Sequence, residues 1–373
     1  MPKRRRAERV LDKLLRGLAV GQWSPGETLP PTRELERQFR SSHATMLDAL
    51  HLAAQRDLLL IRPRQPIEVL PAAADKAGAL LAEQVARSGL RRLAILYPET
   101  MGPVKQAAFF RELIAAVEQR ARAAGFQADV VTWPLLEQVN FARRLPDLGY
   151  GAAFAAAVRV EYLTSLYTMR QQHFPVVLMN ATLPELPMPA VAMDEYGAAR
   201  RMATLLANLG HRNICMLALA FDGRLKQRQH RTYGWFDYLA ESGLGDSCAM
   251  PICYLTSEDE TVKTVERILA LPDPPTALVF AYGVLCQRFL KGFDAARVSV
   301  PQRLSVATFD FLASFTEASW CPPVTSISIS LDRLAECALE MIGKLLAGRR
   351  QPRAIRLPMQ LNLTDSIASP PAA

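Results

Sequence analysis

The chain has 373 residues, of which 50% are hydrophobic and 21% are charged, and it carries a formal net charge of +8. This balance is typical of a globular protein with room for two or three domains, and it excludes a disordered chain. The first residues, MPKRRRAERVLDKLL, lack the apolar run and cleavage site of a signal peptide, and the longest uncharged apolar runs, such as 214–221, are too short to span a bilayer. We therefore expect a cytoplasmic protein with no membrane partner.

The positive charge is concentrated at the amino-terminal end. Residues 1–70 contain 13 Lys and Arg against 8 Asp and Glu, whereas the remaining 303 residues contain 31 against 28. Clustered cations favour binding to nucleic-acid phosphates. The run KRRR at 3–6 is also compatible with a solvated basic tail, so the charge alone does not decide between the two interpretations.

The first 70 residues carry the pattern of three short helices and two strands. Leucines at i, i+3, i+4 and i+7 predict an amphipathic helix over about 7–19. After a loop rich in Gly and Pro, Thr32 is expected to cap a second helix and Ser42 a third. The inward face of the third helix is expected to consist of Met46, Ala49, Leu50 and Ala53. The stretch LLLIRPRQPIEVL then predicts two strands around a turn that contains proline and arginine.

Three helices followed by a two-stranded ribbon predict a winged helix-turn-helix. Such a domain places the amino-terminal turn of its third helix in the major groove of DNA, and its wing lies against the phosphates. The residues expected to contact double-stranded DNA are Thr32, Arg33, Ser42, His43, Thr45, Arg62 and Arg64. The alternatives are a surface ion pair with Glu36 for Arg33, a plain exposed position for His43, and solvated turn charges for the two wing arginines.

Residues 25–50, PGETLPPTRELERQFRSSHATMLDAL, resemble the DNA-binding domain of the GntR family of bacterial regulators. The positions that match the family pattern are Pro25, Gly26, Glu27, Leu29, Pro30, Arg33, Leu35, Phe39, Ser42, Thr45, Ala49 and Leu50. Three positions depart from it, namely Pro31, His43 and Leu47, and two of these replace arginines that would face DNA. The resemblance implies an operator-binding regulator, but because of these departures the operator sequence of its relatives does not carry over to this chain.

From about residue 90, short apolar runs alternate with segments of helical length. This alternation is typical of βαβ units around a parallel sheet. Two successive series of strands are expected, at 92–98, 128–133, 152–158 and 175–180, and at 213–219, 250–255, 276–281 and 304–310. Ligands of such folds bind outside the carboxyl ends of the strands.

The fold class is therefore α/β, with an amino-terminal winged helix-turn-helix at 1–70 and a two-lobed ligand-binding domain at 91–365. The domain boundaries expected around and within them are a linker at 71–90, lobes at about 91–188 and 189–308, crossovers near 310–330, and a tail at 366–373.

Residues 90–363 resemble the LacI family and its periplasmic sugar-binding relatives. The likeness is carried by AVAMDEYGAARRMATLLANLGHRNICMLA, RTYGWFDYL, VSVPQRLSVATFDF and CPPVTSISISLDRLAECALEMIGKLLAGR, and it is weaker before residue 185. It implies a periplasmic-binding-protein-like domain that holds a small molecule, often a sugar, between two lobes. Arg231, Asp194 and Asp310 lie at family positions near the ligand; the alternatives are a surface ion pair for the arginine and a helix cap or structural bond for each aspartate.

The ligand-binding pattern of the family is incomplete in this chain. Gly283 and Val284 replace an Asn and an Asp that accept hydrogen bonds from ligand hydroxyls, and Phe311 replaces a second Asp. Fewer acceptors around a retained arginine favour an anionic or partly aromatic ligand over a polyol. The residues expected to offer stacking faces are Tyr282, Phe311 and Trp320, for which a place in the core is the alternative.

Enzymatic and metal-binding motifs are weak in this sequence. GYGAAF at 149–154 is a fragment of a dinucleotide-binding fingerprint without its third glycine, and no GxxxxGK[ST], HExxH or GxSxG motif occurs. The six cysteines lack the spacing of a zinc site and are expected to be buried thiols. We expect no catalytic residue, no metal and no cofactor.

The two resemblances together suggest a ligand-responsive bacterial transcriptional regulator; repression relieved by the ligand is the expected sign, and activation is the alternative. We expect a homodimer on a two-fold operator, with a small carbohydrate or related molecule as the effector. Two alternatives stay open: a DNA-binding regulator whose effector pocket has lost its ligand, and a solute-binding protein with an incidental basic arm.

Overall fold

The structure, a computed structural model, describes most of the chain. The described residues are 3–19, 22–88, 92–183, 186–220, 230–293, 297–349 and 354–371. The chain forms two compact units. The first unit comprises Met1–Gly102, Ile114–Val191 and Ala335–Ile355, and the second comprises Pro103–Leu113, Ala192–Leu334 and Arg356–Ala373.

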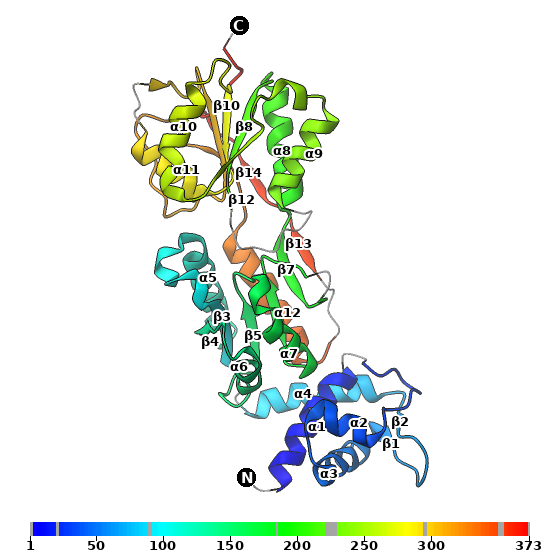
Figure 1. Ribbon diagram of the computed structural model, residues 1–373. Helices are drawn as coiled ribbons and strands as arrows, with labels where there is room; N and C mark the ends of the chain where they lie inside the picture. The colour runs from blue at the N-terminus through cyan, green and yellow to red at the C-terminus, as the bar shows by residue number, and fades with distance from the viewer. Residues whose placement is uncertain are drawn as a thin grey trace. The chain divides into compact units, whose positions relative to one another are not determined.

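The first unit begins with a head, residues 3–88, made of helices and a two-stranded ribbon (Figure 1). Its helices are α1 (Lys3–Ala19), α2 (Thr32–Phe39), α3 (His43–Ala54) and α4 (Ala73–Ser88). Strands β1 (Leu59–Leu60) and β2 (Glu68–Val69) pair antiparallel and form the wing. The predicted winged helix-turn-helix is thereby confirmed.

Apolar side chains on the inner faces of the helices hold the head together. The predicted stripe of α1 and the predicted inward face of α3 are both buried: Leu11, Leu14, Leu15, Leu18, Met46, Ala49, Leu50 and Ala53. Trp23 packs over Gly17, where a Cβ atom would lie 2.7 Å from the indole ring. A larger residue at position 17 would therefore displace the tryptophan from the core.

The two helix caps predicted for the head have different outcomes. Ser42 caps α3 as predicted, because its side chain accepts a hydrogen bond from the backbone N–H of Thr45. Thr32, in contrast, is the first residue inside α2, and the N-cap position belongs to Pro31. Since proline carries no side-chain acceptor, α2 begins without a side-chain cap, and the prediction for Thr32 is wrong.

The segment predicted as a linker, 71–90, contains helix α4. Ala73, Ala77 and Leu81 of this helix are buried in the same hydrophobic cluster as α1 and α3. Their spacing of four residues places them on one helical face, so α4 is a structural part of the head. The sequence did not reveal that this segment is a packed helix, because its apolar face consists mainly of alanines, and an alanine-rich segment is easily read as a linker.

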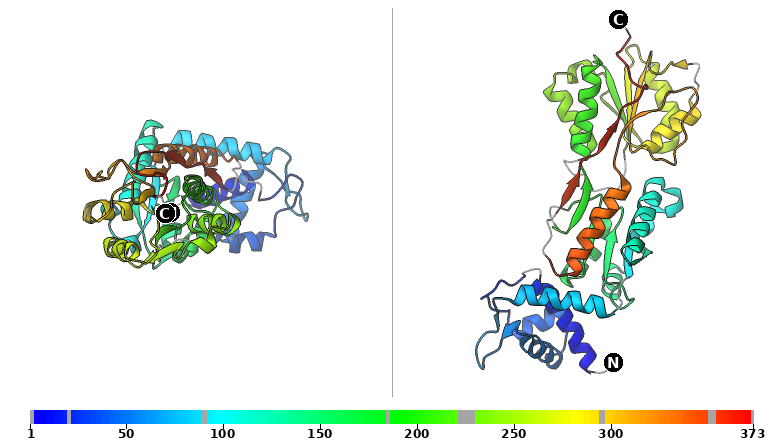
Figure 2. Two further views of the ribbon diagram at one scale, coloured as in Figure 1. Left: turned by 90° about the horizontal axis from the view of Figure 1, so that it is seen from above. Right: turned by 180° about the vertical axis from the view of Figure 1, so that it is seen from behind.

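A six-stranded sheet follows the head, with the order β13-β7-β6-β5-β3-β4. Its strands are β3 (Arg92–Pro98), β4 (Gln127–Trp133), β5 (Ala152–Ala155), β6 (Val176–Met179), β7 (Ala190–Met193) and β13 (Ile355–Leu357). The associated helices are α5 (Ala108–Ala123), α6 (Gln138–Arg144), α7 (Leu163–Gln171) and α12 (Leu331–Leu346). Helices α5 and α12 share one face, joined by an ion pair of 3.8 Å between Arg120 and Glu336, and α6 and α7 cover the other (Figures 1 and 2).

The second unit is built on another six-stranded sheet, with the order β14-β12-β11-β10-β8-β9. Its strands are β8 (Ile214–Leu219), β9 (Ile252–Leu255), β10 (Ala277–Phe280), β11 (Ser305–Phe309), β12 (Thr325–Ser328) and β14 (Gln360–Asn362). Helices α8 (Glu195–Asn208) and α9 (Arg231–Glu241) cover one face of the sheet (Figure 1). Helices α10 (Thr261–Leu269) and α11 (Gly283–Gly292) cover the other. Every strand pair of this sheet is parallel except β12 with β14.

Short 3-10 helices complete the described secondary structure. They are η1 (Glu99–Met101), η2 (Val104–Gln106), η3 (Val160–Tyr162), η4 (Gly245–Ser247) and η5 (Glu258–Glu260). In the described part of the chain, no helix combines the length and the apolar character needed to cross a membrane.

All eight predicted strands are present, and the predicted α/β fold with parallel sheets is confirmed. Several predicted boundaries differ from the structure. The boundaries between the units lie at 102/103, 113/114, 191/192, 334/335 and 355/356, all outside the predicted crossover region 310–330. The predicted tail is anchored as well, because Ser366 is fully buried and exchanges hydrogen bonds with Val306 of β11.

Candidate functional site

The amino-terminal turn of α3 presents two polar side chains of the predicted DNA-binding set. Ser42 and His43 are exposed, whereas Thr45 is only 7% exposed and its hydroxyl lies 2.8 Å from that of Ser42. Thr45 therefore belongs to the helix cap, and its side chain faces the interior of the head. This placement favours a structural role for the side chain of Thr45 over the predicted contact with DNA.

Glu36 of α2 joins the two helices of the helix-turn-helix. Its Oε1 lies 2.6 Å from Nδ1 of His43, at the start of α3. Glu36 was the partner considered for a surface ion pair with Arg33. In the structure Glu36 contacts His43, and Arg33 is exposed. The contact fixes the direction of the imidazole ring on the outer surface of the head.

The wing carries two exposed cations. Arg62 and Arg64 both lie in the turn between β1 and β2, and Arg64 adopts a left-handed backbone conformation with φ of 61°. Strand β2 of the wing is also attached to the loop before α2, because Thr28 forms an antiparallel bridge with Glu68. The head therefore displays Arg33, His43 and the two wing arginines on its surface, with the half-exposed Thr32 at the start of α2.

The second unit contains a buried arginine held by two carboxylates. Arg231, the first residue of α9, is 0% exposed. Its Nη2 atom lies 2.7 Å from Oε1 of Glu195 and 2.9 Å from Oδ2 of Asp310. Its Nη1 atom donates a hydrogen bond to the carbonyl oxygen of Ala281. We call Arg231, Glu195 and Asp310 the arginine cluster.

The fold brings the arginine cluster together at the carboxyl ends of parallel strands. Asp310 directly follows β11 and Ala281 directly follows β10, its parallel neighbour in the sheet of the second unit, and Glu195 is the first residue of α8. Carboxyl ends of neighbouring parallel strands meet at one edge of a sheet, which is where ligands of this fold class bind. Two aromatic rings enclose the guanidinium, with centroids 5.1 Å (Tyr282) and 4.9 Å (Phe309) from its carbon atom.

The charges of the cluster keep Arg231 ionised. Burial alone would lower the pKa of Arg231, but the nearby charges of Asp310 and Glu195 outweigh it, and the pKa is raised. Of the five N–H groups of an arginine, the one on Nε of Arg231 is buried with no acceptor among the described atoms. A ligand oxygen is one group that would satisfy this donor.

His230 belongs to the same region and was missed by sequence reasoning. Its Nε2 atom lies 3.2 Å from the hydroxyl oxygen of Tyr282 and 4.0 Å from Oε2 of Glu195. Its Nδ1 atom accepts a hydrogen bond from the backbone N–H of Thr232, so the neutral ring carries its proton on Nε2 and donates it toward the tyrosine. The only signal in the sequence was the position of this histidine directly before the family arginine.

Asp194 and Gly283 have structural roles in the second unit. Asp194 is the N-cap of α8, where its Oδ1 accepts a hydrogen bond of 3.0 Å from the backbone N–H of Gly197. At Gly283 a Cβ atom would lie 2.2 Å from the carbonyl oxygen of Asp310. The close backbone contact therefore requires a glycine here. The absence of a hydrogen-bond acceptor at position 283, noted in the sequence, is explained by this lack of space for a side chain.

The two other aromatic residues predicted to contact the ligand pack against neighbouring rings. Phe311 meets Phe315 edge to face, with centroids 5.6 Å apart. Trp320 packs against Phe289 and Phe293, and its indole N–H donates a hydrogen bond of 3.1 Å to Leu290. Trp320 is thus part of the packing around α11, which favours the alternative of a place in the core.

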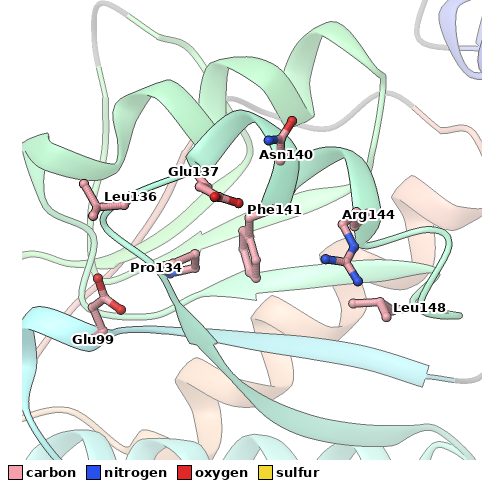
Figure 3. A pocket seen from close by; sticks show the side chains of 8 residues that line it. All are labelled: Glu99, Pro134, Leu136, Glu137, Asn140, Phe141, Arg144 and Leu148. Carbon is pink, nitrogen blue, oxygen red and sulfur yellow. The ribbon is translucent and has the colours of Figure 1, made fainter.

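The first unit contains an open groove with a volume of about 470 Å³ (Figure 3). It is lined by Glu99, Pro134, Leu136, Glu137, Asn140, Phe141, Arg144 and Leu148. The side chain of Glu99 lies toward one end of the groove and that of Arg144 toward the other, with Glu137 and Phe141 between them (Figure 3). Leu136 is 76% exposed at its rim, so the groove offers both apolar area and opposite charges.

Two protein-family models match separate parts of the chain. Residues 6–69 match bacterial regulatory proteins of the gntR family, and residues 203–367 match a periplasmic binding protein-like domain. These two ranges correspond to the head and to most of the second unit. In the described residues, no group of three or more His, Cys, Asp or Glu is arranged to hold a metal ion.

Curated relatives carry regulator names. The chain is 24% identical to the HTH-type transcriptional regulator DegA of Bacillus subtilis over 284 residues, covering 74% of this chain and 80% of DegA. It is 26% identical to the HTH-type transcriptional repressor CytR of Escherichia coli over 262 residues, covering 66% of this chain and 70% of CytR.

Solved structures share the fold. The lac repressor dimer bound to operator and the anti-inducer ONPF matches 78% of this chain and 98% of its own, with a TM-score of 0.63 at 16% identity. A LacI family transcriptional regulator from Enterococcus faecium with bound ribose matches 74% of this chain and 99% of its own, with a TM-score of 0.58 at 16% identity.

Proposed function

Because the chain joins a GntR-family DNA-binding domain to a LacI-type, periplasmic-binding-protein-like domain, we propose that it is a ligand-responsive transcriptional regulator. The head binds operator DNA, and the remainder of the chain binds a small effector. The observation that carries this proposal is the head itself, a complete winged helix-turn-helix whose exposed residues include Arg33, Arg62 and Arg64.

The head is built to read double-stranded DNA in two ways. The amino-terminal turn of α3 brings Ser42 and His43 to the base edges of the major groove, while the arginines of α2 and the wing neutralise phosphates. Because Glu36 orients the ring of His43, this histidine presents Nε2 to the DNA. Thr45 supports the turn from inside and makes no base contact in this proposal.

The arginine cluster favours an uncharged, hydroxyl-bearing effector. Arg231 contributes one positive charge, and Glu195 and Asp310 contribute two negative charges, so the ionised cluster is formally negative. An anionic effector would meet net repulsion, whereas a hydroxyl group both donates to a carboxylate and accepts from an arginine N–H. This revises the expectation of an anionic ligand, and it agrees with the ribose bound to the Enterococcus faecium regulator.

The regulator acts in the cytoplasm as a homodimer on a two-fold operator. The lac repressor that matches this chain is described as a dimer bound to operator. The groove of the first unit supports self-association, because Glu99 at one end and Arg144 at the other are complementary across a two-fold axis. Effector binding shifts the balance between DNA-bound and released forms, and the expected sign is repression relieved by the effector.

Substitution of the exposed arginines tests the head. Each of Arg33→Ala, Arg62→Ala and Arg64→Ala is expected to weaken binding to any duplex and to reduce the slope of log affinity against log salt by about 1, because one phosphate contact is lost. The measurement is fluorescence anisotropy of a labelled duplex at a series of salt concentrations. Arg297→Ala is the control, since this exposed arginine of the second unit pairs with Glu266.

The outcomes separate the alternatives. If the three head variants match the wild-type slope while binding DNA with unchanged affinity, the assigned phosphate contacts are wrong. If the full chain binds no duplex even in dilute buffer, the regulator proposal fails and a solute-binding role takes its place.

A further inference from the structure

One face of helix α1 contacts the first lobe, which we define as the part of the first unit at 92–102, 114–191 and 335–355. Arg9, Lys13 and Arg16 follow one another at intervals of four and three residues, so they share one side of the helix. Nη2 of Arg9 lies 3.0 Å from Oδ1 of Asp147, and both side chains are about half exposed. An ion pair this exposed contributes little to the contact by itself.

The backbone of the head meets the first lobe directly at another point. At Gly348, which follows α12, a Cβ atom would lie 2.7 Å from Cα of Gly78 in α4 and 2.8 Å from Cβ of Ala19 in α1. At Gly78, a Cβ atom would lie 3.0 Å from the carbonyl oxygen of Ala347. Close backbone packing therefore fixes the end of α1 and the middle of α4 against the end of α12.

His173 of the first lobe lies near enough to α1 for the charges of Arg16 and Lys13 to act on it. It follows α7 in a left-handed backbone conformation with φ of 52°, and its Nε2 atom is buried with no hydrogen-bond partner among the described atoms. Burial, followed by the charges of Arg16 and Lys13, lowers the pKa of His173 to about 4. The docked histidine is therefore neutral at physiological pH.

The charges around His173 are mostly positive. On the head, Arg9, Lys13 and Arg16 face the lobe, and Asp12 is the carboxylate that pairs with Arg16, at 3.1 Å. On the lobe, Arg143 and Asp147 both act on Lys13. Arg40, at the end of α2, acts on Arg143 in turn. Burial and then Arg143 lower the pKa of Lys13, so the contact already accommodates more cations than carboxylates.

We propose that the contact between α1 and the first lobe is a latch for the DNA-binding head that acidification releases. A neutral His173 lets α1 stay docked beside Lys13 and Arg16. A proton on Nε2 places a further cation in a buried position next to these two, and the docked arrangement loses stability. The latch goes beyond the proposed regulator function, and its test requires no DNA.

The pH range follows from the two protonation states. A released histidine has an ordinary pKa of about 6.5, whereas docking lowers the pKa to about 4. Docking is therefore fully favoured above pH 6.5 and weakens as the pH falls from 6.5 toward 4. Between pH 8 and pH 5 the docking equilibrium constant is expected to fall about 30-fold.

The experiment compares His173→Asn and His173→Lys in the full chain. Asparagine is neutral and tolerates the left-handed conformation, whereas lysine carries a permanent charge. Small-angle scattering follows head release through the largest dimension of the particle at pH 8 and pH 5. Acetylation of Lys13 by an amine-reactive ester, measured at pH 8 by mass spectrometry, reports the exposure of the contact at one fixed pH.

We expect the wild-type protein to expand at pH 5, His173→Asn to remain docked at both pH values, and His173→Lys to show severalfold faster acetylation of Lys13 at pH 8. His51→Asn, which changes an exposed histidine of α3, is the control and should behave as wild type. The proposal is overturned if His173→Asn expands at pH 5 as the wild type does. Should His173→Lys fail to fold, as judged by circular dichroism, the asparagine variant decides alone.

Discussion

Replacing Arg231 with methionine is expected to lower the free energy of unfolding by about 3–5 kcal/mol. The substitution keeps the apolar volume of the side chain but leaves Glu195 and Asp310 without their shared cation. Both carboxylates are shielded from water, with side-chain exposures of 12% and 11%, so each loses its ionic partner in a place where solvent compensates poorly. Urea denaturation followed by circular dichroism measures the change.

A matched control is available on the same pair of helices. Arg200 of α8 pairs with Glu241 of α9 at 2.5 Å, but these side chains are 31% and 61% exposed. Arg200→Met is therefore expected to cost at most about 1 kcal/mol. Combining Arg231→Met with Glu195→Gln and Asp310→Asn should recover part of the loss, because the buried charges are removed together. Equal effects of Arg231→Met and Arg200→Met would mean that the cluster is accessible to water.

Gly283→Ala is expected to destabilise the protein by about 1–3 kcal/mol or more, by overpacking. Gly283 is the first residue of α11 and has no positive φ, so alanine would suit its backbone if space were available. The added Cβ atom would lie 2.2 Å from the carbonyl oxygen of Asp310 and 2.8 Å from the ring of Phe315. A backbone carbonyl group cannot move aside as easily as a flexible side chain. We therefore expect α11 to shift away from the end of β11, or the end of β11 to shift with it.

Gly343→Ala is the control for Gly283→Ala. Gly343 is an exposed residue of α12, and no atom lies within 4 Å of its added Cβ atom. Alanine should stabilise the protein there by about 0.5–1 kcal/mol, because glycine is a poor helix former. Thermal denaturation of both variants gives opposite signs if the close contact governs position 283. A stabilising Gly283→Ala would show that the contact relaxes without cost.

Much of the fold could be predicted because strand cores are continuous apolar runs. The eight strands identified from such runs include β3 and β10, whose residues are almost entirely buried. Strands β13 and β14 escaped prediction because their residues are partly or fully exposed and therefore show no apolar pattern. Strands β7 and β12 also escaped prediction, although they are buried, because each has only four residues and β12 (TSIS) is mostly polar. Helix α4 escaped because its buried face uses alanines, whose burial depends on the packing of α1 against it.

The candidate site was predicted less completely, since its partners are set by tertiary structure. The sequence located Arg231 and Asp310 through a family motif, but not Glu195, which begins a helix 36 residues before its arginine. It treated Gly283 as a lost acceptor, because the backbone of Asp310 that excludes a side chain there is distant in the chain. The sequence offered Arg33 as a partner of Glu36, whereas the structure pairs Glu36 with His43. This contact could not be predicted because it depends on how α2 and α3 cross.

The central claim is that a small effector controls DNA binding by this chain. The most direct measurement begins with a duplex selected by the full-length protein from a random-sequence library. Its affinity is then measured with and without an uncharged sugar or nucleoside that raises the melting temperature of the protein. We predict a change in affinity of about 5- to 150-fold, corresponding to a coupling free energy of 1–3 kcal/mol. A compound that stabilises the protein and leaves the affinity for the selected duplex unchanged would contradict the claim.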